Sequence, residues 1–482
     1  MGASGGVHGS GGLGGVGGVG GVGGVGGALG SGSGGAGGGI GCRAGDPWPF
    51  VCSQPSEGAC YHDPLPADCD EATGQWVCSF GTVRALEHNC GGSGGAGGNC
   101  DPLPPLGATG GAGGAPLDQL VSLGPPTRYP SGRGPLRLAL ADLDGDRRLD
   151  ILVTNDNGDS RSPASGVSVL LNQGGGTYAS PRSYRATGPY QTYLAVGDVN
   201  GDGKPDLMVT GGPYLDVLLN NGDGTLAAPV HNEIAVSAGN VVIADLDGDG
   251  DNDLVVAAAG EGVAVLSNQG GGSFAAARTY PAGYMPSGLA LGDLDGDGKP
   301  DLAVVSYDSG GPGNNNLSVL LNRGSGDFAP AIAYPAGEFL TAVATGDLDG
   351  DGHLDIVVLD SYSRLAALMN HGDGTFATPV SYARDTLISA VALGDVTGDG
   401  RLDIVGANSL AYGSSGWFGG NVSVLVNGGG GIFGSPVDFA DEAIERSIVL
   451  GDLNEDGKLD VVAVNRSYEC MDTISVLLNR SR

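Results

Sequence analysis

The chain has few basic residues, few aromatic residues and no long apolar segment. Its 482 residues include 22 Lys and Arg against 54 Asp and Glu, so the formal net charge is -32 at pH 7. So acidic a chain is not expected to bind nucleic acid or an anionic membrane. No run of about 18 apolar residues occurs, which predicts no membrane insertion. The first residues, MGASGGVHGS, also lack the basic and apolar regions of a secretory signal.

Motifs of common catalytic families are missing too. The sequence contains no GxSxG elbow, no HExxH motif and no recognisable catalytic Cys and His pair. After residue 121 the only histidines are His231, His353 and His371, and the only tryptophan is Trp417. We therefore predict no catalytic residue. The single Trp also excludes WD repeats, which place a Trp in every unit.

Three segments of unusual composition precede the rest of the chain. Residues 1–41 are mostly Gly and are expected to be disordered, whereas residues 101–121 form a Gly/Pro linker. Residues 42–100 between them are rich in Cys and predict a small disulfide module, because so short a segment cannot build an adequate core. A metal site of Cys with His62 or His88 is the alternative, although no CxxC pair occurs. The disulfide candidates are Cys42, Cys52, Cys60, Cys69, Cys78, Cys90, Cys100 and Cys470. Cys100 pairs either with Cys470 or within the module.

An acidic nonapeptide close to DxDGDGxxD repeats seven times in residues 122–482. Its copies begin at Asp142, Asp198, Asp245, Asp293, Asp347, Asp395 and Asp452. The steps between copies range from 47 to 57 residues, which indicates an array of supersecondary units. The copies hold 27 of the 54 acidic residues, so the negative charge is concentrated in them.

Short apolar segments surround each copy in a constant order. An alternating segment precedes the nonapeptide, a β-branched segment follows it, and a third segment resembling VSVLLN at Val167 comes next. A Gly-rich turn then leads to a fourth segment, as in NQGGGTY. Four short antiparallel strands in about fifty residues are typical of a propeller blade. The sequence therefore predicts an all-β fold, a seven-bladed β-propeller.

The two ends of the array complement each other. The seventh unit stops at SVLLNRSR and lacks a fourth strand, while the segment from Gly124 aligns with the junction between two units from Ala276. We expect residues 125–130 to supply the missing strand and close the ring, which leaves no open sheet edge. Aromatic residues at one position of the repeat are expected to fill the seams between blades: Phe274, Phe328, Phe376 and Phe433.

These repeats resemble the FG-GAP or VCBS repeat, the blade of the integrin α-subunit head and of many bacterial extracellular proteins. The resemblance covers Gly124 to Arg482, about three quarters of the chain. It implies a seven-bladed propeller whose ligand face lies opposite the acidic loops. It also implies a protein that acts outside the cell or on the cell surface.

The nonapeptides are expected to bind calcium, up to seven ions in all. Oxygen ligands at positions 1, 3, 5 and 9, with a backbone carbonyl at position 7, can surround Ca²⁺ at about 2.3 to 2.6 Å. The alternative is a solvated Asp-Gly turn. The candidate side-chain ligands are Asp142, Asp144, Asp146 and Asp150; Asp198, Asn200, Asp202 and Asp206; Asp245, Asp247, Asp249 and Asp253; Asp293, Asp295, Asp297 and Asp301; Asp347, Asp349, Asp351 and Asp355; Asp395, Thr397, Asp399 and Asp403; Asp452, Asn454, Asp456 and Asp460.

The copies differ in ligand quality. Those beginning at Asp245, Asp293 and Asp347 are complete and should fill first. The third position is Asn in the second and seventh copies and Thr397, a poorer ligand, in the sixth. The first copy carries Arg147 where the others have Gly, which should disfavour both the turn and the cation.

The loops opposite the nonapeptides are the expected recognition surface. Loops between second and third strands are long in the first, fourth, sixth and seventh units, and they carry Tyr412, Trp417, Phe418 and Tyr468. Aromatic residues on a rigid scaffold are typical of carbohydrate or protein recognition, and the alternative is that they cover blade edges. We therefore expect a monomeric, non-catalytic adhesion or recognition module. The alternatives are a polysaccharide hydrolase or lyase, and a purely structural spacer.

Overall fold

The chain divides into two compact units, Met1–Gly107 and Ala108–Arg482. The computed structural model describes residues 51–52, 68–70, 75–77 and 120–481, except 157–165, 187–192, 261, 308–315, 383–387, 409–411, 414–415, 418–419, 441–444 and 466–471. In the first unit, β1 (Val51–Cys52), β3 (Gln75–Val77) and β2 (Asp68–Asp70) form a small antiparallel sheet in that order. The boundaries of the predicted Cys-rich module and linker stay predictions.

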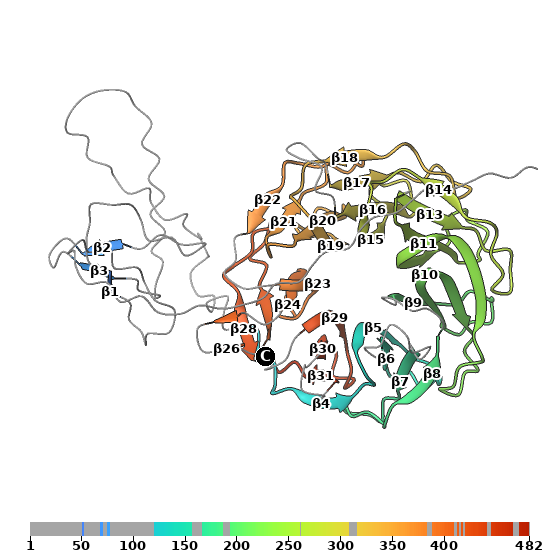
Figure 1. Cartoon of the computed structure of the whole chain (residues 1–482), viewed down its shortest axis with the longest axis horizontal. Helices are drawn as coiled ribbons and strands as arrows, with labels where there is room; N and C mark the ends of the chain where they lie inside the picture. The colour runs from blue at the N-terminus through green and yellow to red at the C-terminus, as the bar shows by residue number, and fades with distance from the viewer. Residues whose placement is uncertain are drawn as a thin grey trace, which may run out of the picture. The chain divides into compact units, whose positions relative to one another are not determined.

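The second unit is an all-β propeller, as the sequence predicts. Its small antiparallel sheets are arranged around a central axis (Figure 1). Along the described ranges no helix is present, so none is available to cross a bilayer.

The sheets of the second unit follow the chain in order. The first contains β5 (Pro135–Ala141), β6 (Asp150–Asn155), β7 (Gly166–Leu170) and β8 (Arg182–Arg185). The next contains β9 (Tyr193–Gly197), β10 (Asp206–Leu218), β11 (Val230–Ala244), β12 (Asp253–Ala258), β13 (Gly262–Leu266) and β14 (Arg278–Tyr280). Two four-stranded sheets follow, β15 (Pro286–Gly292), β16 (Asp301–Ser306), β17 (Leu317–Leu320) and β18 (Ile332–Tyr334), then β19 (Leu340–Gly346), β20 (Asp355–Asp360), β21 (Leu365–Leu368) and β22 (Val380–Tyr382).

Two further sheets complete the ring. One contains β23 (Ile388–Gly394), β24 (Asp403–Asn408), β27 (Asn421–Leu425) and β28 (Val437–Ala440), with the hairpin of β25 (Tyr412–Gly413) and β26 (Gly416–Trp417) between β24 and β27. The last contains β29 (Glu445–Gly451), β30 (Asp460–Asn465), β31 (Thr473–Leu477) and β4 (Thr127–Pro130).

The second and third repeats share one six-stranded sheet. Strand β10 continues from the second strand of its repeat into the third, and β11 continues from the second repeat into the third. The other repeats each form a separate four-stranded sheet. The first strands nevertheless follow one another around the axis, since β5, β9, β11, β15, β19, β23 and β29 contact each other in turn and β29 contacts β5. Seven separate blades therefore stay a prediction where β10 and β11 merge two repeats.

The N-terminal strand closes the ring, as predicted. Strand β4 pairs with β31 in antiparallel register, with Tyr129 opposite Ile474. The closure reaches further along the chain than residues 125–130, because Leu123 bridges Asn479 and the Ser122 carbonyl accepts the Arg480 N–H at 2.6 Å. Both ends of the ring are therefore held in one sheet.

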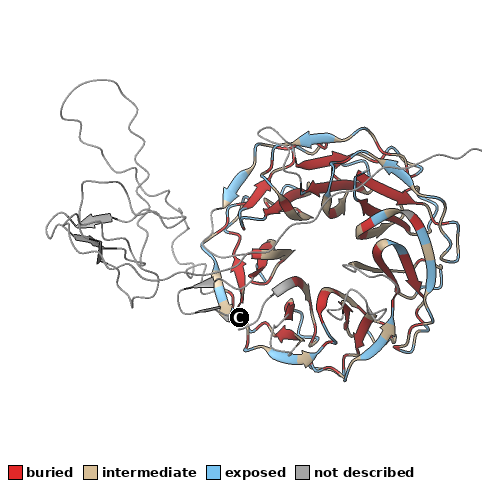
Figure 2. Ribbon diagram, viewed as in Figure 1, coloured by how far each residue is buried: buried red, intermediate tan, exposed pale blue. Residues whose placement is uncertain are grey.

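The apolar core lies between neighbouring sheets. Second and third strands are buried throughout most of their length, whereas the outer fourth strands are exposed (Figure 2). One cluster joins Ala303 and Val319 to Ile356 and Leu368 of the following sheet. The predicted Phe residues lie in these seams: Phe328, Phe376 and Phe433 are at most 8% exposed, and Phe274 packs partly buried against a core cluster.

Candidate metal centre

Each acidic nonapeptide forms the tight loop between the first and second strands of its repeat. Its ninth residue is in every case the first residue of the second strand: Asp150, Asp206, Asp253, Asp301, Asp355, Asp403 and Asp460. All seven loops therefore lie on the same face of the ring, because neighbouring strands run antiparallel.

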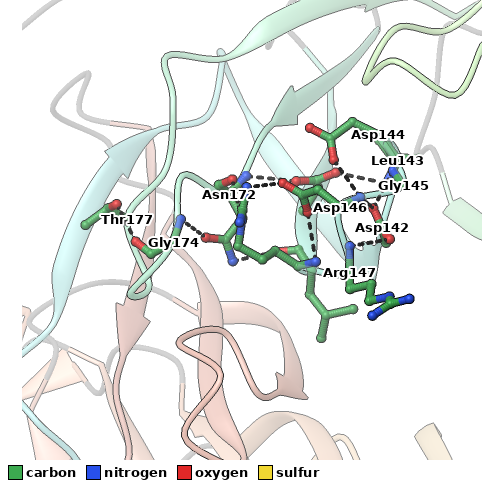
Figure 3. A network of polar contacts seen from close by, with 12 residues as sticks. Asp142, Leu143, Asp144, Gly145, Asp146, Arg147, Asn172, Gly174 and Thr177 are labelled. Atoms are coloured by element: carbon green, nitrogen blue, oxygen red, sulfur yellow. Dashed lines mark hydrogen bonds and ion pairs between the residues drawn. The ribbon is translucent and has the colours of Figure 1, made fainter.

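The first Asp of each loop folds the backbone around its own carboxylate. In the first loop, the Asp142 carboxylate accepts the N–H groups of Gly145, Asp146 and Arg147 at 2.7, 3.1 and 2.7 Å (Figure 3). The Asp293 carboxylate makes the equivalent bonds to Gly296 and Gly298, at 2.8 and 2.9 Å. These bonds hold the third and fifth side chains close to the first.

In four loops, three carboxylate groups come together. Their oxygen atoms lie within 4.8 Å of one another in the groups Asp142, Asp144 and Asp146; Asp245, Asp247 and Asp253; Asp293, Asp295 and Asp297; and Asp347, Asp349 and Asp351. Two oxygen ligands of one calcium ion, each at about 2.3 to 2.6 Å, can be no more than about 5 Å apart. The spacing of these oxygens therefore fits a calcium ion.

Electrostatics within these groups also favour a bound cation. Burial, followed by the charge of Asp146, raises the pKa of Asp144. Burial and the charge of Asp249 raise the pKa of Asp247 in the same way. A divalent cation would reverse this repulsion between carboxylates.

The loops also differ in the charge of their seventh residue, which is not one of the side-chain ligands. In four loops it is a cation that pairs with the carboxylate of the fifth residue, as in Arg148 with Asp146 and Lys204 with Asp202. The bond from Lys204 lowers the pKa of Asp202. In the third loop the seventh residue is instead Asp251, so that loop has more negative charge and no cation of its own at this position. We expect it to bind calcium most tightly.

The remaining loops have Asn or Thr in place of the third carboxylate. The Asn200 and Asn454 side-chain oxygens accept the N–H groups of Asp202 and Asp456, both at 2.9 Å, so each lies where the third carboxylate lies elsewhere. The Thr397 hydroxyl donates to the Asp395 carboxylate at 3.2 Å. A hydroxyl that donates to a carboxylate contributes no charge to a cation site.

The ninth Asp has a structural role that the sequence interpretation as a ligand did not include. Its side chain is buried in every repeat, at most 1% exposed. In the fourth loop, the Asp301 Oδ2 accepts the N–H of Leu294 at 2.8 Å and Oδ1 accepts the N–H of Asn322 at 2.6 Å. Burial raises the pKa of Asp150, Asp301, Asp403 and Asp460 to about 6, although the backbone bonds oppose this.

An Asn at the end of the third strand links each loop to the preceding one. The Asn322 Nδ2 donates to the Pro300 carbonyl of its own loop at 3.2 Å and to the Leu246 carbonyl of the third loop at 2.9 Å. The same bond to the preceding loop joins Asn172 to Leu453, Asn268 to Val199, Asn370 to Leu294, Asn427 to Leu348 and Asn479 to Val396. This role was not predicted, although an Asn follows the third strand in every repeat, as in VLLN, and was a usable signal.

The second repeat is the exception, since the buried Asn220 Nδ2 has no hydrogen-bond partner.

Asn322 and Asn220 can therefore be compared directly to measure what the amide bonds contribute to stability. The substitution Asn322→Ala removes the donor to two carbonyls and should lower the free energy of unfolding by about 1 to 3 kcal/mol. Asn220→Ala should cost less, because both side chains make the same bond to a Gly N–H through Oδ1 and only Asn322 also donates. Urea unfolding of the two variants measures the difference, and equal losses would contradict the role of the amide.

Arg147 forms the turn of the first loop, but with a strained backbone. It takes the left-handed conformation with φ of 71°, where glycines at the same position have φ between 80 and 92°. Its loop also brings three carboxylates together. The first loop thus keeps its turn with a strained residue. Glu455 has a similarly strained backbone at the fourth position of the seventh loop, with φ of 63°.

This strain predicts that Arg147→Gly stabilises the protein. A non-Gly residue in the left-handed region costs about 1 to 2 kcal/mol, and the greater freedom of Gly in the unfolded chain offsets about half of that. A net gain of about 0.5 to 1 kcal/mol is expected, visible as a higher melting temperature in metal-free buffer. Arg148→Gly is the control, because Arg148 is absent from the residues with positive φ. A loss of stability in Arg147→Gly would contradict the strain.

The predicted ligand face is described only in part. The second-to-third loops are long where expected: Asn155 to Gly166, Ser306 to Leu317, Asn408 to Asn421 and Asn465 to Thr473 separate the flanking strands. Tyr412 and Trp417 are paired across the β25 and β26 hairpin. Phe418 and Tyr468 lie outside the described residues, so the ligand face stays a prediction.

Six of the eight cysteines predicted to form disulfides lie outside the described residues. Cys52 lies on β1 and Cys69 on β2. Cys42, Cys60, Cys78, Cys90, Cys100 and Cys470 lie outside the described residues.

Comparisons with known proteins agree with the architecture. The family described as FG-GAP-like repeat matches residues 142–209, 198–256, 245–304, 304–358 and 347–406, which together span more than half of the chain. No curated protein sequence matches the chain.

Solved structures are similar to this chain at low sequence identity. BBS1N, solved in complex with ARL6DN, is 14% identical with a TM-score of 0.51, over 75% of this chain and 97% of that chain. A lectin of Agrocybe aegerita that recognises non-reducing terminal N-acetylglucosamine is 22% identical with a TM-score of 0.45, over 63% of this chain and 80% of that chain.

Proposed function

We infer that this chain, which belongs to the FG-GAP-like repeat family, is a calcium-binding propeller that recognises protein or carbohydrate ligands without acting on them chemically. The observation that carries the proposal is the grouping of three carboxylates within 4.8 Å in four loops of one face. Calcium holds the loops and the ring together, and the opposite face carries the ligand. Millimolar calcium and the Cys-rich segment suit a protein outside the cell or on its surface.

The residues present fit calcium better than magnesium. The loops offer carboxylate, amide and backbone oxygens on a short flexible turn, which suits the larger and more variable coordination shell of Ca²⁺. The first, third and fifth side chains would hold the ion directly. The ninth Asp would add an oxygen while its bonds to the backbone keep the loop attached to the third strand, as Asp253 does within the third group.

Removal of calcium should destabilise the ring. At a free concentration ten times the dissociation constant, each filled site adds about 1.4 kcal/mol to the free energy of unfolding. We expect excess EDTA to lower the melting temperature of the chain by several degrees, measured by calorimetry. An unchanged melting temperature would contradict the proposal.

Two substitutions in the third loop separate ligation from charge. Asp247→Asn and Asp251→Asn each remove one negative charge from this loop, but only the Asp247 side chain belongs to the carboxylate group. Calorimetric titration with calcium should show a larger loss of affinity at this site in Asp247→Asn than in Asp251→Asn.

The calcium effect should also depend on pH. Between pH 4 and pH 6 the folded state binds more protons than the unfolded state, because burial raises the pKa of Asp150, Asp301, Asp403 and Asp460 to about 6 from 3.8. The stability of the metal-free protein should therefore rise as pH falls towards 5. Calcium must displace these protons, so the melting-temperature gain from calcium should be smaller at pH 5 than at pH 7.5. A gain that grows on acidification would contradict this account.

The recognition face is proposed at the long loops of the sixth, seventh and first repeats, with Tyr412, Trp417, Phe418 and Tyr468 as its aromatic residues. Immobilised glycans, tested with and without calcium, distinguish a recognition module from a structural spacer. Release of products from a polysaccharide would favour the alternative of a hydrolase or lyase.

A further inference from the structure

A cluster of three aromatic rings lies on the face opposite the acidic loops. Tyr307 directly follows β16, Phe339 directly precedes β19, and Tyr362 lies in the turn between β20 and β21. The ring centroids of Tyr307 and Phe339 are 5.1 Å apart, and those of Phe339 and Tyr362 are 6.2 Å apart. Tyr307 is 44% exposed and Tyr362 57% exposed. We call these three residues with Arg364 the aromatic platform.

Phe339 holds its place through a strained backbone. Its φ is 53°, an outlier for a bulky residue that costs about 1 to 2 kcal/mol. The aligned residue in the first repeat is Gly134, with φ of 66°. Both carbonyls accept the same bond, from Ser361 at 3.0 Å and from Asp156 at 2.9 Å. A Phe thus occupies a bend that a Gly occupies elsewhere, and strain kept beside a half-exposed ring cluster points to function.

Asp360 fixes the other side of the platform. Its Oδ1 accepts the N–H groups of Tyr362 and Arg364, both at 2.9 Å, and its Oδ2 accepts Arg364 Nε–H at 2.6 Å. The Asp360 side chain is 3% exposed while that of Arg364 is 53% exposed. The guanidinium lies 5.2 Å from the Tyr362 ring centre. The ring and the guanidinium are therefore preorganised, and Asp360 holds the guanidinium through Nε.

The size of the platform favours a small ligand over a protein. An aromatic side chain buries about 150 to 250 Å² when fully covered, so three partly exposed rings offer at most a few hundred Å². A specific protein interface needs about 800 Å² on each partner. A second copy of this chain or another protein would need far more surface than the platform supplies.

The chemistry of the platform fits a sugar. Aromatic faces pack against the apolar C–H face of a pyranose, while phenol hydroxyls and guanidinium N–H groups bind its hydroxyls. The net charge of -32 disfavours an anionic ligand, and Asp360 neutralises Arg364. We propose that the aromatic platform is a second binding site, one that takes a neutral saccharide. The inference extends the proposed recognition function to a different place and needs no calcium ion in contact with the sugar.

The test uses the full chain in calcium buffer on an array of neutral oligosaccharides of glucose, galactose, mannose and N-acetylglucosamine, with acidic oligosaccharides alongside. Calorimetry then gives the affinity for the best neutral probe. Tyr307→Ala, Tyr362→Ala and Phe339→Gly should each weaken binding by about tenfold or more, about 1.4 kcal/mol. Phe339→Gly removes the ring at a bend where Gly is the natural residue, so its melting temperature should not fall. Tyr214→Ala is the control, because Tyr214 is an exposed tyrosine on the same face but in β10.

Each outcome decides the question. Tenfold losses in the platform variants with unchanged binding in Tyr214→Ala support the site. The absence of any neutral ligand, a preference for acidic sugars, or equal binding by all variants would overturn it. Sugar binding lost only in Trp417→Ala would overturn the platform and leave the proposed function intact. Binding to the platform in a chain that takes up no calcium would reject the calcium role instead.

Discussion

The ring depends on a carboxylate that is buried at the start of every second strand. Removing a carboxylate from water is unfavourable unless hydrogen bonds replace the lost solvation. Each of these residues, such as Asp301, receives two backbone N–H groups, one from the loop before it and one from the end of the third strand. Bonds to a charged acceptor are stronger than neutral ones. One side chain therefore fixes the loop, the second strand and the third strand relative to one another.

The Asn that bonds to this carboxylate also connects its repeat to the preceding one. Its backbone N–H binds the buried Asp, and its amide binds the preceding loop, as Asn322 does with Leu246. A cation that orders one loop thereby orders a carbonyl on which the next repeat depends. Except in the second repeat, the stability of the loop tips and the packing between sheets are therefore coupled through the buried Asp and this Asn. The same logic explains why the ring needs its N-terminal segment: Asn479 binds Val396, and Leu123 bridges Asn479 from the other side.

The features that all repeats share could be predicted from the sequence, whereas the features of single residues or single repeats could not. The constant spacing of DxDGDGxxD, the missing fourth strand after SVLLNRSR and its counterpart before Pro135 were enough to predict the propeller and its closure. The sequence did not reveal that the ninth Asp is a buried hydrogen-bond acceptor, because an Asp at this position is equally expected for a metal ligand. The first loop keeps its turn despite the strain at Arg147, because the bond from the Arg147 N–H to Asp142 holds this residue in place. The merger of two repeats through β10 and β11 arises from continuous strand pairing, which composition does not reveal.

The aromatic platform illustrates the same division. Tyr307, Phe339 and Tyr362 come from three separate connections, and no motif joins them in the sequence. They meet only because the ends of β16 and β20 and the start of β19 lie on one face. Residues that recur in every repeat form the ring and its acidic loops, so the packing of the fold restricts which residues can stand there. Residues in the connections on the opposite face do not take part in this repeated packing. Individual repeats can therefore differ there without loss of the fold. A strained Phe339 in the place of a Gly is therefore a feature of this junction and not of the repeat.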